Sequence, residues 1–168
     1  YAEDGKKKEV VSYFDGSLRN RQTVTTINTD NNAVVGEVIY DAQGRPAVEV
    51  LPVPTSVNVL KYHSTANQGA FNLNEAGTSY SYLDFDLNTQ NEVDTESVEK
   101  IMGIASGASN YYSPSNTFTG AERDRIPNAA QYPFSQIEYT PDNTGRIRRK
   151  SGVGKTHQLG LGHEMEYY

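Results

Sequence analysis

The chain of 168 residues has no cysteine, no tryptophan and only two methionines. The absence of cysteine excludes a disulfide framework, a thiolate nucleophile and a cysteine-based zinc site. No apolar run approaches the roughly 20 residues of a membrane-spanning helix, and neither an initiator methionine nor a signal peptide is present. Because both ends lie within strand-like patterns, we expect the chain to be a fragment of a longer protein.

Apolar residues are scarce as well. Only 36% of the residues are hydrophobic and the mean hydropathy is −0.67, which predicts a thin core. The 12 tyrosines suit amphipathic sheet faces better than a dense aliphatic interior. The acidic run at 75–99 and the basic run at 145–155 are typical of solvated faces. A net charge of −6 without a recognised binding motif argues against nucleic acid as a partner.

Two stretches 26 residues apart carry the same pattern of an aromatic residue, an aspartate, a turn and an arginine. The residues of the two copies are Phe14, Asp15, Gly16 and Arg19, then Tyr40, Asp41, Gly44 and Arg45. Between them, two segments rich in β-branched residues flank a polar stretch, at 23–27 and 34–39, which predicts a β-hairpin. A repeat of this size indicates units that stack on their neighbours.

The repeated pattern has a mechanical interpretation. An aspartate at the end of a strand can accept hydrogen bonds from backbone amides of the turn, and Gly44 can adopt positive φ at little cost. Arg45 can lie over a neighbouring ring or pair with an acid. A looser third copy places Tyr139 before Gly145 and Arg146, with its aspartate displaced to Asp142. Repeated along the chain, such turns stack into a ladder.

The Tyr40-Asp41 pair followed by Gly44-Arg45 resembles the repeat of the RHS/YD-repeat family of bacterial proteins. The segments 132–147 and 152–164 look like the amino-terminal shell region of large RHS proteins from bacteria that use type 9 secretion, and the resemblance covers most of residues 10–168. It implies β-ribbons wound into a hollow shell around a toxin or effector. The implied partners are neighbouring shell segments, the cargo and the secretion machinery, and the implied location is secreted or on the cell surface.

The copies depart from the family pattern in two places. In the first copy, Phe14 takes the tyrosine position, and Gly16 stands two places too early because Ser17-Leu18 interrupts the Gly-Arg pair. In the third copy, the interval from Tyr139 to the Gly-Arg pair is two residues longer than in the second.

The predicted fold is all-β, built of antiparallel hairpin repeats that form part of an extended shell, with long loops and one short helix. We expect three zones of one continuous fragment, namely strand-rich hairpins at 1–65, an irregular segment at 66–131 and a strand-rich segment at 132–168. The strands expected in the first two zones lie at 9–14, 23–27, 34–39, 47–54, 57–62 and 80–86. A helix is expected near 95–105 and a long loop at 103–120.

Asp84, Asp86 and Asn88 match the first three ligand positions of a calcium loop. Thr89 stands where that loop requires glycine, and Thr95 stands where it requires a bidentate glutamate. These three residues are the only metal candidates, and the sequence predicts neither a metal nor a cofactor.

Three other motifs fail on their context. The run 152–156 ends like a phosphate-binding loop, but Arg149 replaces the first glycine. His157 and the pair His163-Glu164 lack the spacing of a zinc hydrolase. Serine, aspartate and histidine occur without a nucleophile elbow.

The sequence therefore predicts a non-enzymatic structural segment whose strands pair with strands before and after it. The competing hypothesis is an independent β-sandwich adhesin or carbohydrate-binding module, since tyrosines suit sugar stacking. An enzyme is the third hypothesis. A sandwich should have short protected edges, whereas a shell segment should expose edges for pairing.

Overall fold

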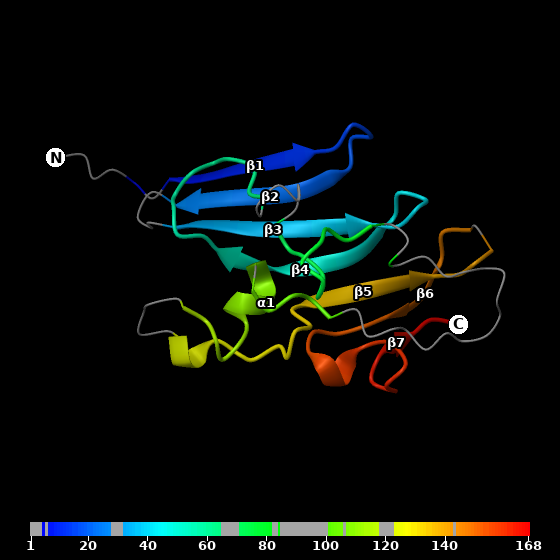
Figure 1. The fold of residues 1–168 in the computed structure, drawn as a ribbon. Coiled ribbons are helices and arrows are strands. Elements are labelled where there is room, and N and C mark those ends of the chain that lie inside the picture. Colours follow the sequence, from blue (N-terminus) through cyan, green and yellow to red (C-terminus); the bar gives the residue numbers. More distant parts are fainter. Residues whose placement is uncertain are drawn as a thin grey trace.

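The computed structural model describes residues 5, 7–27, 32–64, 71–81, 84, 101–105, 107–117, 123–142 and 144–168. In this part of the chain, seven strands form one antiparallel sheet in which the spatial order follows the sequence order (Figure 1). The strands are β1 (Lys8–Phe14), β2 (Asn20–Ile27), β3 (Ala33–Tyr40), β4 (Pro46–Pro54), β5 (Phe134–Tyr139), β6 (Ile147–Lys150) and β7 (Met165–Glu166). The prediction of an all-β antiparallel fold is confirmed.

Helical structure is limited to short segments. The described residues form one helix, α1 (Gly107–Tyr111), and two 3-10 turns, η2 (Arg123–Arg125) and η3 (Lys155–His157). None of the helices in this part is long and apolar enough to cross a membrane.

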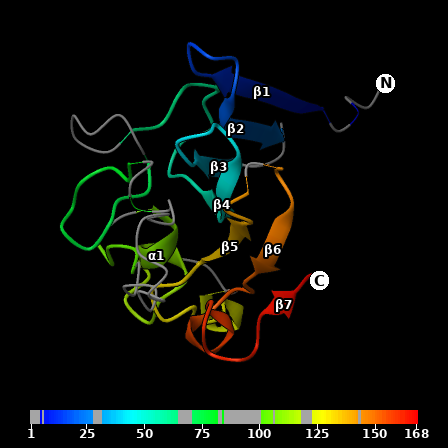
Figure 2. The same ribbon diagram turned by 90° about the vertical axis from the view of Figure 1, so that its right-hand side faces the viewer.

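The sheet has one covered face. In β2 and β3 every second residue is buried, which is the alternation expected of strands whose two faces differ. Viewed along the strands, the described residues 55–64, 71–81, 101–105 and 107–117, which include α1, lie on one side of the sheet (Figure 2). We call them the overlying segment. Burial of this face provides the driving force for folding.

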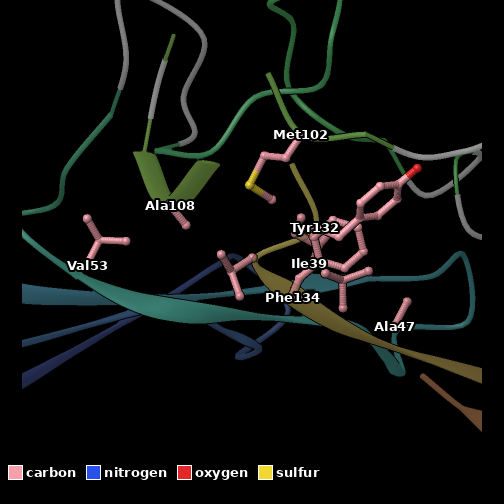
Figure 3. Close-up of a cluster of buried hydrophobic side chains, with 9 residues drawn as sticks. Ile39, Ala47, Val53, Met102, Ala108, Tyr132 and Phe134 are labelled. Atoms are coloured by element: carbon pink, nitrogen blue, oxygen red, sulfur yellow. The ribbon is translucent and has the colours of Figure 1, made fainter. Parts of the chain in front are cut away.

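The main core lies between this face and the overlying segment. Ile39, Val53 and Phe134 point up from the sheet, and Met102 and Ala108 meet them from above (Figure 3). Met102 and Ala108 are fully buried. A smaller cluster of Val24, Ala33 and Val35 fills the same face beside β2.

Buried polar side chains fix the overlying segment to the sheet. Gln22 donates to the carbonyl of His63 at 2.9 Å and accepts from its amide at 2.8 Å. Glu37 accepts from the amide of Phe71, at 3.2 Å, and from the amide and side chain of Asn72, at 3.0 and 2.7 Å. Asn72 in turn accepts from the amide of Ala108 at 2.8 Å. Such satisfied bonds offset the cost of burying these polar groups.

Glu37 carries an electrostatic cost despite these bonds. Burial raises the pKa of its carboxyl above the ordinary value, and the hydrogen bonds from Asn72 and Phe71 counteract this only in part. The hydrogen bonds of this carboxyl hold the overlying segment in place, while burial disfavours its charged form.

The strand expected at 57–62 is wrong. This segment crosses the sheet as an irregular connection, in which the Val57 carbonyl accepts from the Ala33 amide and the Leu60 carbonyl accepts from the Tyr13 hydroxyl. A tight turn from the Lys61 amide to the Val59 carbonyl interrupts the extended backbone. β-branched residues favoured a strand here, but tertiary contacts overrode that preference.

The helix expected near 95–105 is wrong in the part that is described, and 95–100 lies outside it. Met102 pairs with Asn74 in an isolated antiparallel bridge, and its amide donates to Gln131. The helix of this region begins instead at Gly107, so it interrupts the loop expected at 103–120.

Part of the strand expected at 80–86 also lies outside the described residues. Tyr80 and Ser81 are not in a strand, and Asp84 lies in a helical turn. The Tyr80 hydroxyl donates to the Ile101 carbonyl.

Candidate functional site

The turn between β3 and β4 is organised around one buried aspartate. One carboxylate oxygen of Asp41 accepts from the amides of Gln43, at 3.0 Å, and Arg45, at 2.8 Å. The other oxygen accepts from Nε of Arg45 at 2.7 Å. Gly44 has φ of 77°, the left-handed conformation that glycine adopts without strain. The aspartate thus closes the turn and orients the arginine.

The turn between β1 and β2 repeats this arrangement. Asp15 accepts from the amides of Ser17 and Arg19 and, at 2.7 Å, from Nε of Arg19. Burial acts to raise the pKa of Asp15, but the backbone and side-chain hydrogen bonds from Arg19 and the amide of Ser17 together lower it below its ordinary value. The carboxylate is therefore held in its charged form.

The residue that corresponds to Gly44 in this first turn is Leu18, not Gly16. Leu18 has φ of 58° and is 84% exposed, whereas Gly16 is not among the residues with positive φ. A leucine in this conformation is strained, and the bonds to Asp15 hold it there.

The third turn, between β5 and β6, keeps the same spacing from aspartate to arginine. Asp142 accepts from Nη2 of Arg146 at 2.8 Å, and Gly145 has φ of 75°. The two additional residues of this copy, Thr140 and Pro141, precede the aspartate. Hydrogen bonds from the side chains of Thr140, Thr144 and Arg146 hold the pKa of Asp142 well below its usual range.

The three turns contact one another through arginine and tyrosine. Cζ of Arg19 lies 5.3 Å from the ring centroid of Tyr40, and Cζ of Arg45 lies 4.2 Å from that of Tyr139. Each arginine therefore lies over the tyrosine that precedes the next turn, a cation–π arrangement.

The hydrogen bonds of the two tyrosine hydroxyls are also equivalent. Tyr40 donates to the carbonyl of Asn20 at 2.8 Å, and Tyr139 donates to the carbonyl of Pro46 at 2.9 Å. In both contacts the acceptor is the residue immediately after the stacked arginine. Burial, with the charge of the nearby aspartate, raises the pKa of both hydroxyls, so both stay protonated as donors at neutral pH.

We call these three turns and the two stacked tyrosines the turn ladder. It comprises Asp15, Leu18 and Arg19, then Tyr40, Asp41, Gly44 and Arg45, and finally Tyr139, Asp142, Gly145 and Arg146. Phe14 precedes the first turn and is 59% exposed. Leu18 and the carbonyl acceptors were not predicted from the sequence. The signal that identifies Leu18 is the constant interval of four residues from aspartate to arginine in all three copies.

The basic run at 145–155 is largely neutralised by carboxylates on other elements. Glu138 on β5 accepts from Arg149 at 2.8 and 2.9 Å and from Arg148 at 3.3 Å. Lys150 lies 3.5 Å from Glu49. These pairs link β6 to its neighbours and leave little unpaired positive charge for a polyanion.

The described residues do not assemble a metal site. No group of three or more histidine, aspartate or glutamate side chains close enough to hold an ion occurs among them. Asp84 accepts from the Ser81 amide at 2.6 Å, and Asp86 and Asn88 lie outside the described residues. The rings of His157 and His163 pack edge to face, 5.9 Å apart.

A hollow of about 770 Å³ lies between the end of β4 and α1. Its lining includes Lys61, His63, Phe71, Asn110 and Tyr111. Burial lowers the pKa of His63, and Lys61 is the cationic side chain of the described lining. The described lining offers no carboxylate beside His63, and hence no paired acid and base.

The comparisons with known proteins give one match. The family model described as "Domain of unknown function (DUF6443)" matches residues 1–98, which include the first two turns of the turn ladder. No curated protein and no solved structure matches the chain. Because the family model covers more than half of its length, the chain belongs to the DUF6443 family.

Proposed function

We propose that this chain is a structural segment of a secreted or surface-exposed bacterial RHS/YD-repeat shell that encloses a toxin or effector, and that it has no catalytic role. The observation that carries the proposal is the turn ladder, in which each turn holds the tyrosine of the next. Three successive hairpins that dock in this way form a continuous wall, because the same kind of contact joins the first hairpin to the second and the second to the third.

The stacking contacts suit a wall better than a ligand site. The contact of Arg45 with Tyr139 joins the start of β4 to the end of β5, although residues 55–133, the overlying segment among them, separate these two strands in sequence. A long insertion between two successive turns of the turn ladder therefore leaves their contact intact. Chain-closure entropy grows only slowly with loop length, so such an insertion is tolerated.

The edges of the sheet also support the proposal. β1 is a seven-residue edge strand with one neighbouring strand among those described, and Val10 and Phe14 on it are more than half exposed. A long, partly apolar edge is a template for pairing with a further strand. All strands of the described part belong to one sheet, so nothing there favours a two-sheet sandwich that binds sugars.

The test is made on the natural polypeptide in the bacterium that encodes it. An antibody against the 168 residues should detect a much larger polypeptide, outside the cytoplasm, whose cargo resists added protease. Tyr139→Ala should open the wall and expose the cargo, while Tyr139→Phe, which keeps the ring over Arg45, should protect it. Detection of a separate 168-residue protein inside the cell, or equal cargo digestion in both variants, would refute the proposal.

A further inference from the structure

The last turn of the ladder is complete but has no ring over its arginine. Arg146 donates to Asp142 through Nη2 and to Thr144 through Nε, whereas Arg19 and Arg45 donate to their aspartates through Nε. Its side chain is 72% exposed. The exposed fractions for Arg19 and Arg45, which lie over tyrosine rings, are 34% and 23%. Among the described residues no aromatic ring covers Arg146, although it stands four residues after its aspartate like the other two.

The two occupied positions define where such a ring must lie. Gln22 on β2 pairs with Glu37 on β3, and the same register continued along the strands places Tyr40 opposite Arg19. Val48 pairs with Gln136 on β5, and the register there places Tyr139 opposite Arg45. The stacked tyrosine thus comes from the neighbouring strand, at the position directly opposite the arginine.

β7 directs the chain toward the same position beside Arg146. Arg149 on β6 pairs with Glu166, and the Tyr167 amide donates to the Arg148 carbonyl at 2.9 Å. Continued in this register, Tyr168 lies opposite Ile147, and the next position along the strand lies opposite Arg146. Tyr168 itself is fully exposed, and its hydroxyl donates to Glu166.

We propose that Arg146 is a docking site for a tyrosine side chain carried on a strand that prolongs β7, at the position directly after Tyr168. The ring lies over the guanidinium, and its hydroxyl donates to the Ile147 carbonyl, the equivalent of the Asn20 and Pro46 carbonyls. This inference rests on the proposed function, since it identifies where the next unit of the wall attaches.

The other end of the ladder has different chemistry. The aromatic position of the first turn is Phe14, which has no hydroxyl to donate to a carbonyl. The hydroxyl bond of the other two contacts is therefore impossible at Phe14. Of the three turn arginines in the described residues, only Arg146 has no ring over it.

The experiment extends the full chain after Tyr168 by Tyr-Asp-Ala-Gln-Gly, copied from residues 40–44, and follows trypsin cleavage after Arg146 by mass spectrometry. Trypsin must take the arginine side chain into its specificity pocket, so a ring over the guanidinium should slow cleavage there by roughly two- to fivefold. Cleavage after Arg123 and Arg125, in η2, should be unchanged and serves as the internal control.

Two matched extensions make the test specific. Ala-Asp-Ala-Gln-Gly removes the ring and should give no protection. Moving the tyrosine one position further along should also give none, because neighbouring strand residues point to opposite faces.

Equal cleavage rates after Arg146 for the tyrosine and alanine extensions would overturn the assignment. So would protection by the shifted tyrosine, or protection of the unextended chain that increases with protein concentration, which would mean that a second copy covers Arg146. These outcomes leave the location and cargo experiments unaffected, so the two proposals fail separately.

Discussion

The guanidinium of Arg45 lies 4.2 Å from the ring centroid of Tyr139, although the overlying segment separates the two residues in sequence. Asp41 accepts a 2.7 Å bond from Nε of Arg45, and the ring of Tyr139 lies over the guanidinium. The Asp41 carboxylate, the Arg45 guanidinium and the Tyr139 ring thus form one cluster that joins two strands. The same contact links Arg19 to Tyr40, so the sheet is fixed at one end by a repeated device.

Gly44→Val should destabilise the protein by about 1–3 kcal/mol, because valine is strained at positive φ. A Cβ at Gly44 would also lie 3.4 Å from Nη1 of Arg19, in the neighbouring turn. Urea unfolding monitored by circular dichroism measures the change. Gln43→Ala, at an exposed position of the same turn, should stay within about 0.5 kcal/mol, and equal losses for the two variants would contradict the assigned turn.

Leu18→Gly should have the opposite effect and stabilise the protein by about 0.5–1 kcal/mol. Leu18 has φ of 58° and is 84% exposed, so glycine relieves strain and removes almost no buried surface. Ser17→Gly is the control, and it should cost up to about 1 kcal/mol because it only adds backbone freedom to the unfolded chain. A loss of stability in Leu18→Gly would show that the leucine side chain makes a contact that outweighs its strain.

The sequence could predict the turn at Asp41 to Arg45 because all of its bonds are local. The strands at 9–14, 23–27, 34–39 and 47–54 were also predictable, since they are rich in β-branched residues and turn residues separate them. The pairing of Arg45 with Tyr139 was not, because it depends on which strand lies beside β4. Local preference likewise failed at 57–62, where a tight turn at Lys61 and bonds to Ala33 and Tyr13 determine the backbone. It also failed at Met102, which pairs with Asn74 in an isolated bridge.

The contact of Arg45 with Tyr139 should show a coupling free energy of about 0.5–2 kcal/mol in a double-mutant cycle. The variants are Arg45→Ala, Tyr139→Leu and their combination, followed by urea unfolding. Arg45→Ala alone also leaves the Asp41 carboxylate buried without its cation, and the cycle removes that cost from the result. A control cycle of Arg45→Ala with Tyr111→Leu should give a coupling below about 0.5 kcal/mol. A coupling no larger for Tyr139 would mean that the stacking contact does not stabilise the protein.

The stability of the protein should depend on pH through Glu37. Burial raises the pKa of this carboxyl above its ordinary value of 4.5, so the folded state binds the proton more tightly than the unfolded state does. The contribution of Glu37 to stability is therefore fully present below about pH 4.5, and it is lost as the pH rises through the folded pKa.

Glu37→Gln removes this titration and should flatten the corresponding part of the pH profile. The measurement is the free energy of unfolding in urea from pH 4 to pH 8, taken as the difference between the natural chain and the variant. That difference should fall as the pH rises and then level off. Carboxylates such as Asp15 and Asp142, whose pKa values are lowered, titrate in both proteins and cancel. Glu49→Gln, at an exposed position on β4, provides the matched control because it alters no buried carboxyl. A pH-independent difference for Glu37→Gln would mean that the buried carboxyl titrates alike in the folded and unfolded states.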